Sequence, residues 1–233
     1  MEACGEEGQL KLLGATRSPF LVRVRIALAL KGIDYEFIEE DFQNKSQLLL
    51  QSNPVHKMIP VLIHNGKPVC ESMIIVQYID EAWYSKAPNL MSKDPYDRAI
   101  ARFWSAFVDD KIVPCLRGVL NGQGEQQQKA AEESVANFLL LEEALQTNGK
   151  TYFGGDEIGL VDISLGGIVV FIKTMEKVTN IVLIDTDKMP LLSAWAERFY
   201  KADGLKDVLS DPAEIFEFIT GWRAKLTSPP AGN

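Results

Sequence analysis

The pattern of secondary-structure signals changes once along this chain, near residue 95. Before that point, short apolar and β-branched runs alternate with helix-length segments, whereas after it every periodic segment has helical spacing. Such a change predicts an α/β unit followed by an all-helical unit. At 233 residues the chain lies at the upper end of one domain or forms two small ones.

The first unit is predicted to run strand, helix, strand, helix, two strands and helix. Pro19 and Gly32 bracket its first helix in the usual order, with proline at the first helical position and glycine after the last. Asn65-Gly66, between two short apolar runs, is typical of a β-hairpin with a two-residue turn. The predicted elements are residues 9–13, 19–31, 34–38, 45–52, 61–64, 68–70 and 72–83.

The second unit begins after a linker. Ala87-Pro88-Asn89 and Lys93-Asp94-Pro95 predict that linker over residues 86–95. Helices are then predicted at residues 96–120, 126–147, 160–178, 190–201 and 212–224. We therefore expect domains at 9–85 and 96–226, a flexible N-terminus at 1–8 and a disordered tail at 227–233.

Charge and cysteine content exclude several classes of function. The net charge of -8 argues against nucleic acid or an anionic membrane as a partner, because both need clustered lysine and arginine. Three cysteines without a CxxC pair argue against a disulfide framework and against a zinc site, so no bound metal is expected. The acidic first residues lack the apolar run of a secretory signal, and the apolar stretch 163–172 is too short to cross a bilayer. A cytoplasmic location is the resulting expectation.

Three short motifs in the first unit could serve one chemical task. Ser18-Pro19-Phe20 opens a helix, Ile59-Pro60-Val61 enters a strand, and Glu71-Ser72 opens another helix. Each has an architectural explanation by itself, since serine is a common helix N-cap and proline suits a strand edge. Their order and spacing within the alternating unit suggest a glutathione site.

Together with Asn53-Pro54-Val55-His56-Lys57 and Cys70-Glu71-Ser72, these motifs show that the chain resembles the plant tau-class glutathione transferases over nearly its whole length. The resemblance implies a thioredoxin-like N-terminal domain (α/β) and an all-α C-terminal helical domain. It also implies a homodimer with glutathione as cosubstrate, no other cofactor, and hydrophobic small-molecule electrophiles as partners. The expected role is detoxification of xenobiotics or of the products of oxidative stress.

The same resemblance assigns roles in glutathione binding. Ser18 is the catalytic hydroxyl, and the backbone of Ile59, next to a cis bond to Pro60, pairs with the cysteinyl backbone of glutathione. Ser72 at a helix start receives the γ-glutamyl carboxylate, while Glu71 takes the ammonium group.

Lys45 is expected to bind the glycyl carboxylate at the other end of glutathione, although a lone lysine is more often only solvated. One departure from the family lies nearby, because many members carry a second lysine where this chain has Met58. We expect its loss to weaken glutathione binding modestly.

The energetics allow Ser18 to activate glutathione without acting as a base. A free thiol has a pKa near 8.5, so only about 3 per cent is thiolate at neutral pH. Lowering that pKa by roughly two units requires about 2.7 kcal/mol. A hydrogen bond to a charged group supplies roughly 1.5 to 3 kcal/mol, and a helix N-terminus adds about 0.3 to 1. Since position 18 is serine rather than cysteine, the sulfur nucleophile must come from glutathione itself.

The electrophile pocket is assigned by resemblance to aromatic residues and one lysine, although aromatic stripes on helices more often belong to a core. Its predicted members are Phe20, Phe107, Lys111, Phe218 and Trp222. Their size suggests a broad apolar cleft for bulky planar electrophiles.

Three other residues are given structural explanations. Asp162 falls at the third position of a helix capped at Gly159, where an acidic side chain stabilises the helix start. Cys70 and Cys115 are expected to be buried small hydrophobes.

Two alternatives to conjugation remain open at this level. The protein could act mainly as a glutathione peroxidase, or it could carry apolar metabolites without turnover.

Overall fold

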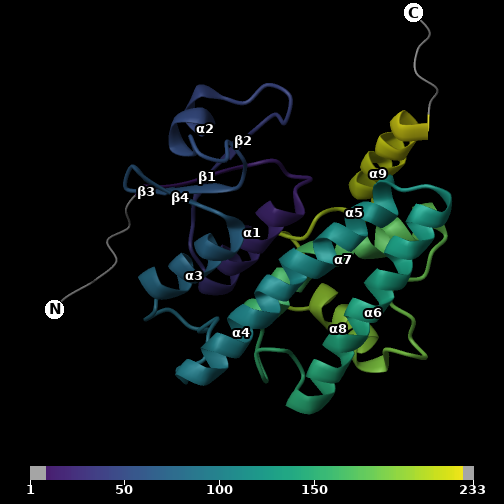
Figure 1. Ribbon diagram of the computed structural model, residues 1–233. Helices are drawn as coiled ribbons and strands as arrows, with labels where there is room; N and C mark the ends of the chain where they lie inside the picture. The colour runs from purple at the N-terminus through teal and green to yellow at the C-terminus, as the bar shows by residue number, and fades with distance from the viewer. Residues whose placement is uncertain (1–8, 228–233) are drawn as a thin grey trace, which may run out of the picture.

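The computed structural model describes residues 9–227 of the chain (Figure 1). The predicted flexible N-terminus and the tail from 228 onward lie outside the described residues. No helix within this range is long and apolar enough to cross a membrane.

The N-terminal part forms the predicted α/β unit around one mixed sheet. The strands are β1 (Leu10–Gly14), β2 (Glu36–Glu39), β3 (Val61–His64) and β4 (Lys67–Cys70), in the order β2-β1-β3-β4. Strands β1 and β2 are parallel, while β1–β3 and β3–β4 are antiparallel. Three helices complete the unit, namely α1 (Pro19–Lys31), α2 (Gln47–Ser52) and α3 (Ser72–Ala82).

Strand alternation divides the apolar side chains of the sheet between its two faces. Leu12 and Leu62 join the main core with α1 and α3, while Leu13, Val61 and Leu49 of α2 form a smaller cluster. Figure 1 shows α2 on the opposite side of the sheet from α1 and α3. This layered arrangement is the predicted thioredoxin-like unit.

Among the described residues, the regular elements after the linker are all helices, as predicted. The elements are α4 (Pro95–Phe107), a π turn η1 (Val108–Ile112), α5 (Val113–Asn121), α6 (Gly124–Asn148), α7 (Leu160–Thr179), α8 (Pro190–Tyr200) and α9 (Pro212–Thr227). Helix α7 is buried along most of its length and packs against α1, α4, α8 and α9, so it forms the centre of this part.

The single helix predicted over 96–120 is interrupted by the π turn. The backbone N–H of Val113 donates to the carbonyl of Val108, five residues earlier. Pro114 follows directly and has no N–H to continue the regular ladder, and its ring would crowd a regular helix. The extra residue in this turn therefore lies where a proline disturbs the helix.

Two adjacent glycines let α7 approach both neighbours closely. A Cβ atom on Gly166 would lie 2.1 Å from the Phe199 ring on α8. A Cβ atom on Gly167 would lie 2.5 Å from Cγ of Arg23 and 2.9 Å from the carbonyl oxygen of Pro19, both on α1. Any larger side chain at either position would push a helix away.

Asp162 has the predicted structural role at the start of α7. Its buried carboxylate accepts hydrogen bonds from the backbone N–H groups of Gly159 (2.9 Å), Gly154 (2.8 Å) and Phe153 (3.0 Å). It also accepts one from the indole of Trp195 at 2.7 Å. Burial raises the pKa of Asp162, and these four hydrogen bonds act in the opposite direction. The residue ties a loop, a helix start and α8 together.

Candidate glutathione site

The register of the sheet brings four chain segments to one edge. Leu13 on β1 pairs with Val61 on β3, which pairs in turn with Cys70 on β4. On the other side of β1, Gly14 pairs with Glu39 at the end of β2. The loop after β1, the segment after β2, the entry to β3 and the end of β4 therefore meet at the same edge.

These four segments carry the residues predicted to bind glutathione. Ser18 follows β1, Lys45 follows β2, Ile59 precedes β3 and Glu71 follows β4. The predicted set is thus distributed along one side of a single sheet, although its members are up to about fifty positions apart in sequence.

Ser18 caps α1 and keeps its own proton available. The side chain is only 4 % exposed, and its oxygen accepts a long hydrogen bond of 3.4 Å from the backbone N–H of Leu21. A hydroxyl that accepts at a cap still has one O–H to donate. Within residues 9–227 no acceptor for that proton is found, so capping and donation to a ligand are compatible.

The junction between β4 and α3 has an unusual backbone. Glu71 adopts φ 70° and ψ 119°, a left-handed conformation that costs a non-glycine residue roughly 1–3 kcal/mol. Glu71 is the N-cap of α3, whereas our sequence interpretation made Ser72 a natural cap. The sharp turn at Glu71 makes Ser72 the first helical residue, so Glu71 takes the cap position.

No side chain caps α3. Its first N–H groups can therefore receive an external carboxylate, as expected from the sequence. The Glu71 carboxylate is half exposed beside them, with His56 Nε2 at 4.0 Å. The uncapped start of α3 and a half-exposed carboxylate thus lie side by side.

Arg23 supports this junction from inside the protein, and sequence reasoning missed it. Its side chain is 0 % exposed, and Nη1 donates to the hydroxyl of Ser72 at 3.3 Å. Nε donates to the carbonyl of Ser164 at 2.9 Å. The guanidinium also donates to both carboxylate oxygens of Asp109 in the π turn, at 2.7 and 3.2 Å. Arg23 therefore connects a predicted glutathione residue with the helical part.

At the entry to β3 the Ile59–Pro60 peptide bond is cis, as the resemblance implied. The Asn53 amide donates to the carbonyl of Met58 at 2.9 Å, and its oxygen accepts from the backbone N–H of His56 at 3.1 Å. Asn53 thereby fixes the loop. Within the described range the backbone of Ile59 makes no hydrogen bond and remains open to a ligand strand.

Lys45 lies next to Met58, the position at which many family members have a second lysine. Its Nζ is 4.0 Å from the sulfur of Met58. The next residue, Ser46, is held by the buried carboxylate of Glu40, which accepts from both its backbone N–H and its hydroxyl. The segment that carries Lys45 is thus anchored, while its ammonium is free of any carboxylate partner among residues 9–227.

The predicted electrophile residues are only partly brought together. Phe218 and Trp222 lie next to each other on α9, with ring centroids 6.4 Å apart. Phe20 lies over the guanidinium of Arg23 at 5.1 Å. Phe107 instead packs on Trp104, 5.4 Å away on the same helix.

Lys111 lies on the side of the helix that carries Cys115, a thiol that contacts Glu133 on α6. Between residues 9 and 227 no hydrogen bond, ion pair or ring contact joins Lys111 or Phe107 to the other three predicted members. Whether all five line one pocket stays a prediction.

Cys70 and Cys115 are half-buried rather than buried. Burial raises the pKa of the Cys70 thiol, and the neighbouring Glu71 carboxylate raises it further. Burial also raises the pKa of Cys115, with Glu133 contributing in the same direction. Neither thiol is activated as a nucleophile.

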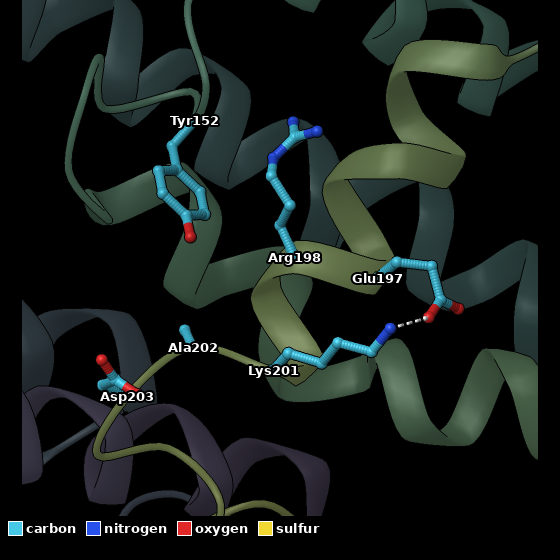
Figure 2. A pocket seen from close by; sticks show the side chains of 6 residues that line it. All are labelled: Tyr152, Glu197, Arg198, Lys201, Ala202 and Asp203. Atoms are coloured by element: carbon cyan, nitrogen blue, oxygen red, sulfur yellow. Dashed lines mark ion pairs between the residues drawn. The ribbon is translucent and has the colours of Figure 1, made fainter.

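Two cavities lie elsewhere in the described structure. One, of about 820 Å³, lies between the linker, α4, α6 and the loop before α7. The other, of about 430 Å³, lies at the end of α8 and is lined by Tyr152, Glu197, Arg198, Lys201, Ala202 and Asp203 (Figure 2). Neither is lined by a residue that the sequence predicted to bind glutathione or electrophile.

Family models match both parts of the chain. Residues 8–81 match "Glutathione S-transferase, N-terminal domain", and residues 96–203 match "Glutathione S-transferase, C-terminal domain".

Individual relatives agree with these models. Glutathione S-transferase U16 of Arabidopsis thaliana is 47% identical over 219 residues, which cover 92% of this chain and 94% of the relative. The tau-class transferase from mango is 45% identical with a TM-score of 0.86, covering 94% of this chain and 99% of that one. Rice GST1 in complex with glutathione is 37% identical with a TM-score of 0.87, covering 95% of this chain and 99% of that one.

Proposed function

Since this chain belongs to the tau class of plant glutathione transferases, we propose that its conjugation reaction depends on the hydroxyl of Ser18. The comparisons support glutathione conjugation and do not favour the peroxidase or carrier alternative. What supports the role of Ser18 is its place at the sheet edge with a proton left to donate.

Glutathione is proposed to lie along this edge. Its γ-glutamyl carboxylate binds the open start of α3 at Ser72, and its ammonium binds Glu71. Its cysteinyl backbone pairs with the free backbone of Ile59, and its glycyl carboxylate binds Lys45. The glutathione complex of the rice relative supports binding of this tripeptide.

In this arrangement the thiol lies at the start of α1. The hydroxyl of Ser18 donates to the sulfur and stabilises the thiolate, so the thiol proton is released to solvent at neutral pH. The thiolate then attacks an electrophilic carbon, a carbon–sulfur bond forms, and a leaving group departs with its bonding electrons. The remaining rate enhancement comes from holding glutathione and the electrophile close together in the right orientation.

The remaining parts of the proposal follow from the family. Hydrophobic electrophiles bind on the side of α9, and the protein acts as a cytoplasmic homodimer in detoxification and stress response. Glutathione is the cosubstrate, and no other cofactor takes part.

The test is conjugation of glutathione to chlorodinitrobenzene between about pH 5.5 and 9, with three variants. Ser18→Ala removes both the cap and the hydroxyl, Ser18→Gly removes the hydroxyl but costs the cap only a few tenths of a kcal/mol, and Ser18→Thr keeps both. We expect the alanine and glycine variants to lose about ten- to a hundredfold of the neutral-pH rate, equivalent to about 1.5–3 kcal/mol.

The pH profile of these two variants should shift towards the free-thiol pKa near 8.5, while Ser18→Thr keeps a neutral-pH rate. If Ser18→Gly retains the parent profile, the hydroxyl is only a helix cap and the thiol is activated by another group.

A further inference from the structure

Arg17 directly precedes the proposed catalytic serine and reaches towards the last helix. Consecutive Cα atoms are about 3.8 Å apart, so Arg17 and Ser18 leave the same turn of the loop. The Arg17 guanidinium lies over the ring of Phe218 on α9, with its carbon 5.3 Å from the ring centroid. Figure 1 shows the loop between β1 and α1 on the side of the molecule where α9 lies.

The backbone of this loop is fixed by contacts that do not involve Arg17. Glu39 at the end of β2 accepts hydrogen bonds from the backbone N–H and hydroxyl of Thr16, at 3.1 and 2.6 Å. The Ser18 N–H donates to the carbonyl of Ala15 at 2.7 Å. Both oxygens of the Glu39 carboxylate thus already accept hydrogen bonds. The exposed Arg17 side chain extends from a backbone that these contacts hold in place.

Arg17 differs from most arginines of this protein in having unused donors. Arg23 donates to Asp109, Arg25 to the carbonyl of Asp207, and Arg198 to the carbonyl of Thr151. In the part of the chain that the structure describes, Arg17 forms no hydrogen bond or ion pair, and it lies over the ring of Phe218. A guanidinium that lies over a ring and makes no hydrogen bond keeps its N–H donors free for a bidentate carboxylate.

We propose that Arg17 is a specificity-determining residue that binds an anionic group, a carboxylate in the first instance, on the electrophile. The apolar body of such a substrate would lie against Phe218, and its reactive carbon would face the glutathione sulfur held at Ser18. A protein with a net charge of -8 repels anions at long range, so a local cation is needed to accept them. The inference rests on the proposed placement of the electrophile between Ser18 and α9.

The test compares two electrophiles of nearly the same shape but different charge, 4-chloro-3,5-dinitrobenzoate and its neutral carboxamide, whose difference in intrinsic reactivity cancels when each variant is compared with the parent. The quantity measured is the ratio of their kcat/KM values with glutathione. In Arg17→Gln we expect this ratio to fall about three- to tenfold, mainly through a higher KM for the benzoate. Arg17→Lys should keep part of the preference, and raising the salt concentration should reduce the ratio in the parent but hardly in Arg17→Gln.

The matched control is Arg198→Gln, which removes the same charge on α8, in the cavity of Figure 2. Its ratio should equal that of the parent. An unchanged ratio in Arg17→Gln, or an equal fall in Arg198→Gln, overturns the proposal. If the parent conjugates chlorodinitrobenzene through Ser18 and yet shows this negative result, only the role of Arg17 fails.

Discussion

The proposed glutathione-binding groups and the proposed electrophile-binding groups of this molecule come from different kinds of structural element. We call the two regions the glutathione side and the electrophile side. On the glutathione side, the proposed binding groups lie where strands end, and several are backbone groups, such as those of Ile59 and the first turn of α3. On the electrophile side, they are side chains on helices, and Phe107 faces Trp104 rather than Phe218. The position of a site formed at strand ends is fixed by the fold, whereas the shape of a site formed by helix side chains can change with each single substitution.

The two sides also differ in what their buried polar residues do. Asp162 in the helical part holds loops and helices together. Arg23 crosses from α1 into the helical part and contacts a residue of each side. We therefore predict that substitution of Asp162 lowers stability alone, while substitution of Arg23 lowers stability and weakens glutathione binding together.

The largest expected effect is that of Asp162→Ala. The change leaves four donors without their acceptor, and each buried unsatisfied donor costs about 1–3 kcal/mol. We expect the free energy of unfolding to fall by at least about 3 kcal/mol, measured by urea denaturation with tryptophan fluorescence. The KM for glutathione of the folded protein should stay within about twofold, because Asp162 is not at the sheet edge.

The control is Asp156→Ala, which breaks an exposed ion pair with Lys150 and should cost less than about 1 kcal/mol. Equal costs for the two variants would contradict the structural role of Asp162.

Arg23→Met should have the next largest effect. It leaves the Ser164 carbonyl and both carboxylate oxygens of Asp109 without their arginine donor, which we expect to lower the free energy of unfolding by about 2–3 kcal/mol. The hydroxyl of Ser72 also loses its donor, so the KM for glutathione should rise several-fold. Steady-state kinetics at varied glutathione concentration measures this second effect.

Arg25→Met is the matched control, since Arg25 lies on the same helix and makes one hydrogen bond, to the Asp207 carbonyl. A loss of stability in Arg23→Met without any change in KM would show that the two sides are independent.

The smallest effect is expected for Met58→Lys. The new ammonium would lie near Lys45, whose Nζ is 4.0 Å from the sulfur of Met58, and both could contact the glycyl carboxylate. We expect the KM for glutathione to fall about two- to threefold, because exposed ion pairs contribute less than about 1 kcal/mol. Met58→Leu should leave it unchanged. No improvement with lysine would mean that position 58 does not reach the ligand.

The same contrast explains what could be predicted from the sequence. Pro19 and Gly32 define α1 to the residue, and Asn65-Gly66 defines the hairpin, because these signals act on the local backbone. The proposed glutathione residues were predicted from motifs and from the family resemblance, and the strand order brings them to one edge of the sheet.

Three features could not be predicted in this way, because each depends on distant parts of the chain. Arg23 looks like an ordinary helix residue in the sequence, and it is buried only because Ser164 and Asp109 approach it. The contact of Arg17 with Phe218 joins residues about two hundred positions apart. The π turn arises inside a segment with unbroken helical periodicity, where Pro114 is the sequence signal that a regular helix is disturbed.

The close fit at Gly167 limits how the two parts of this enzyme can be exchanged in protein engineering. A chimaera that joins residues 9–85 to the helical part of another transferase keeps the approach of α7 to α1 only if the donor also has glycine at this position. It must further supply an acidic residue in place of Asp109, or the arginine on α1 is left without its counter-ion. Recombination between relatives should therefore succeed when these positions are inherited as a group.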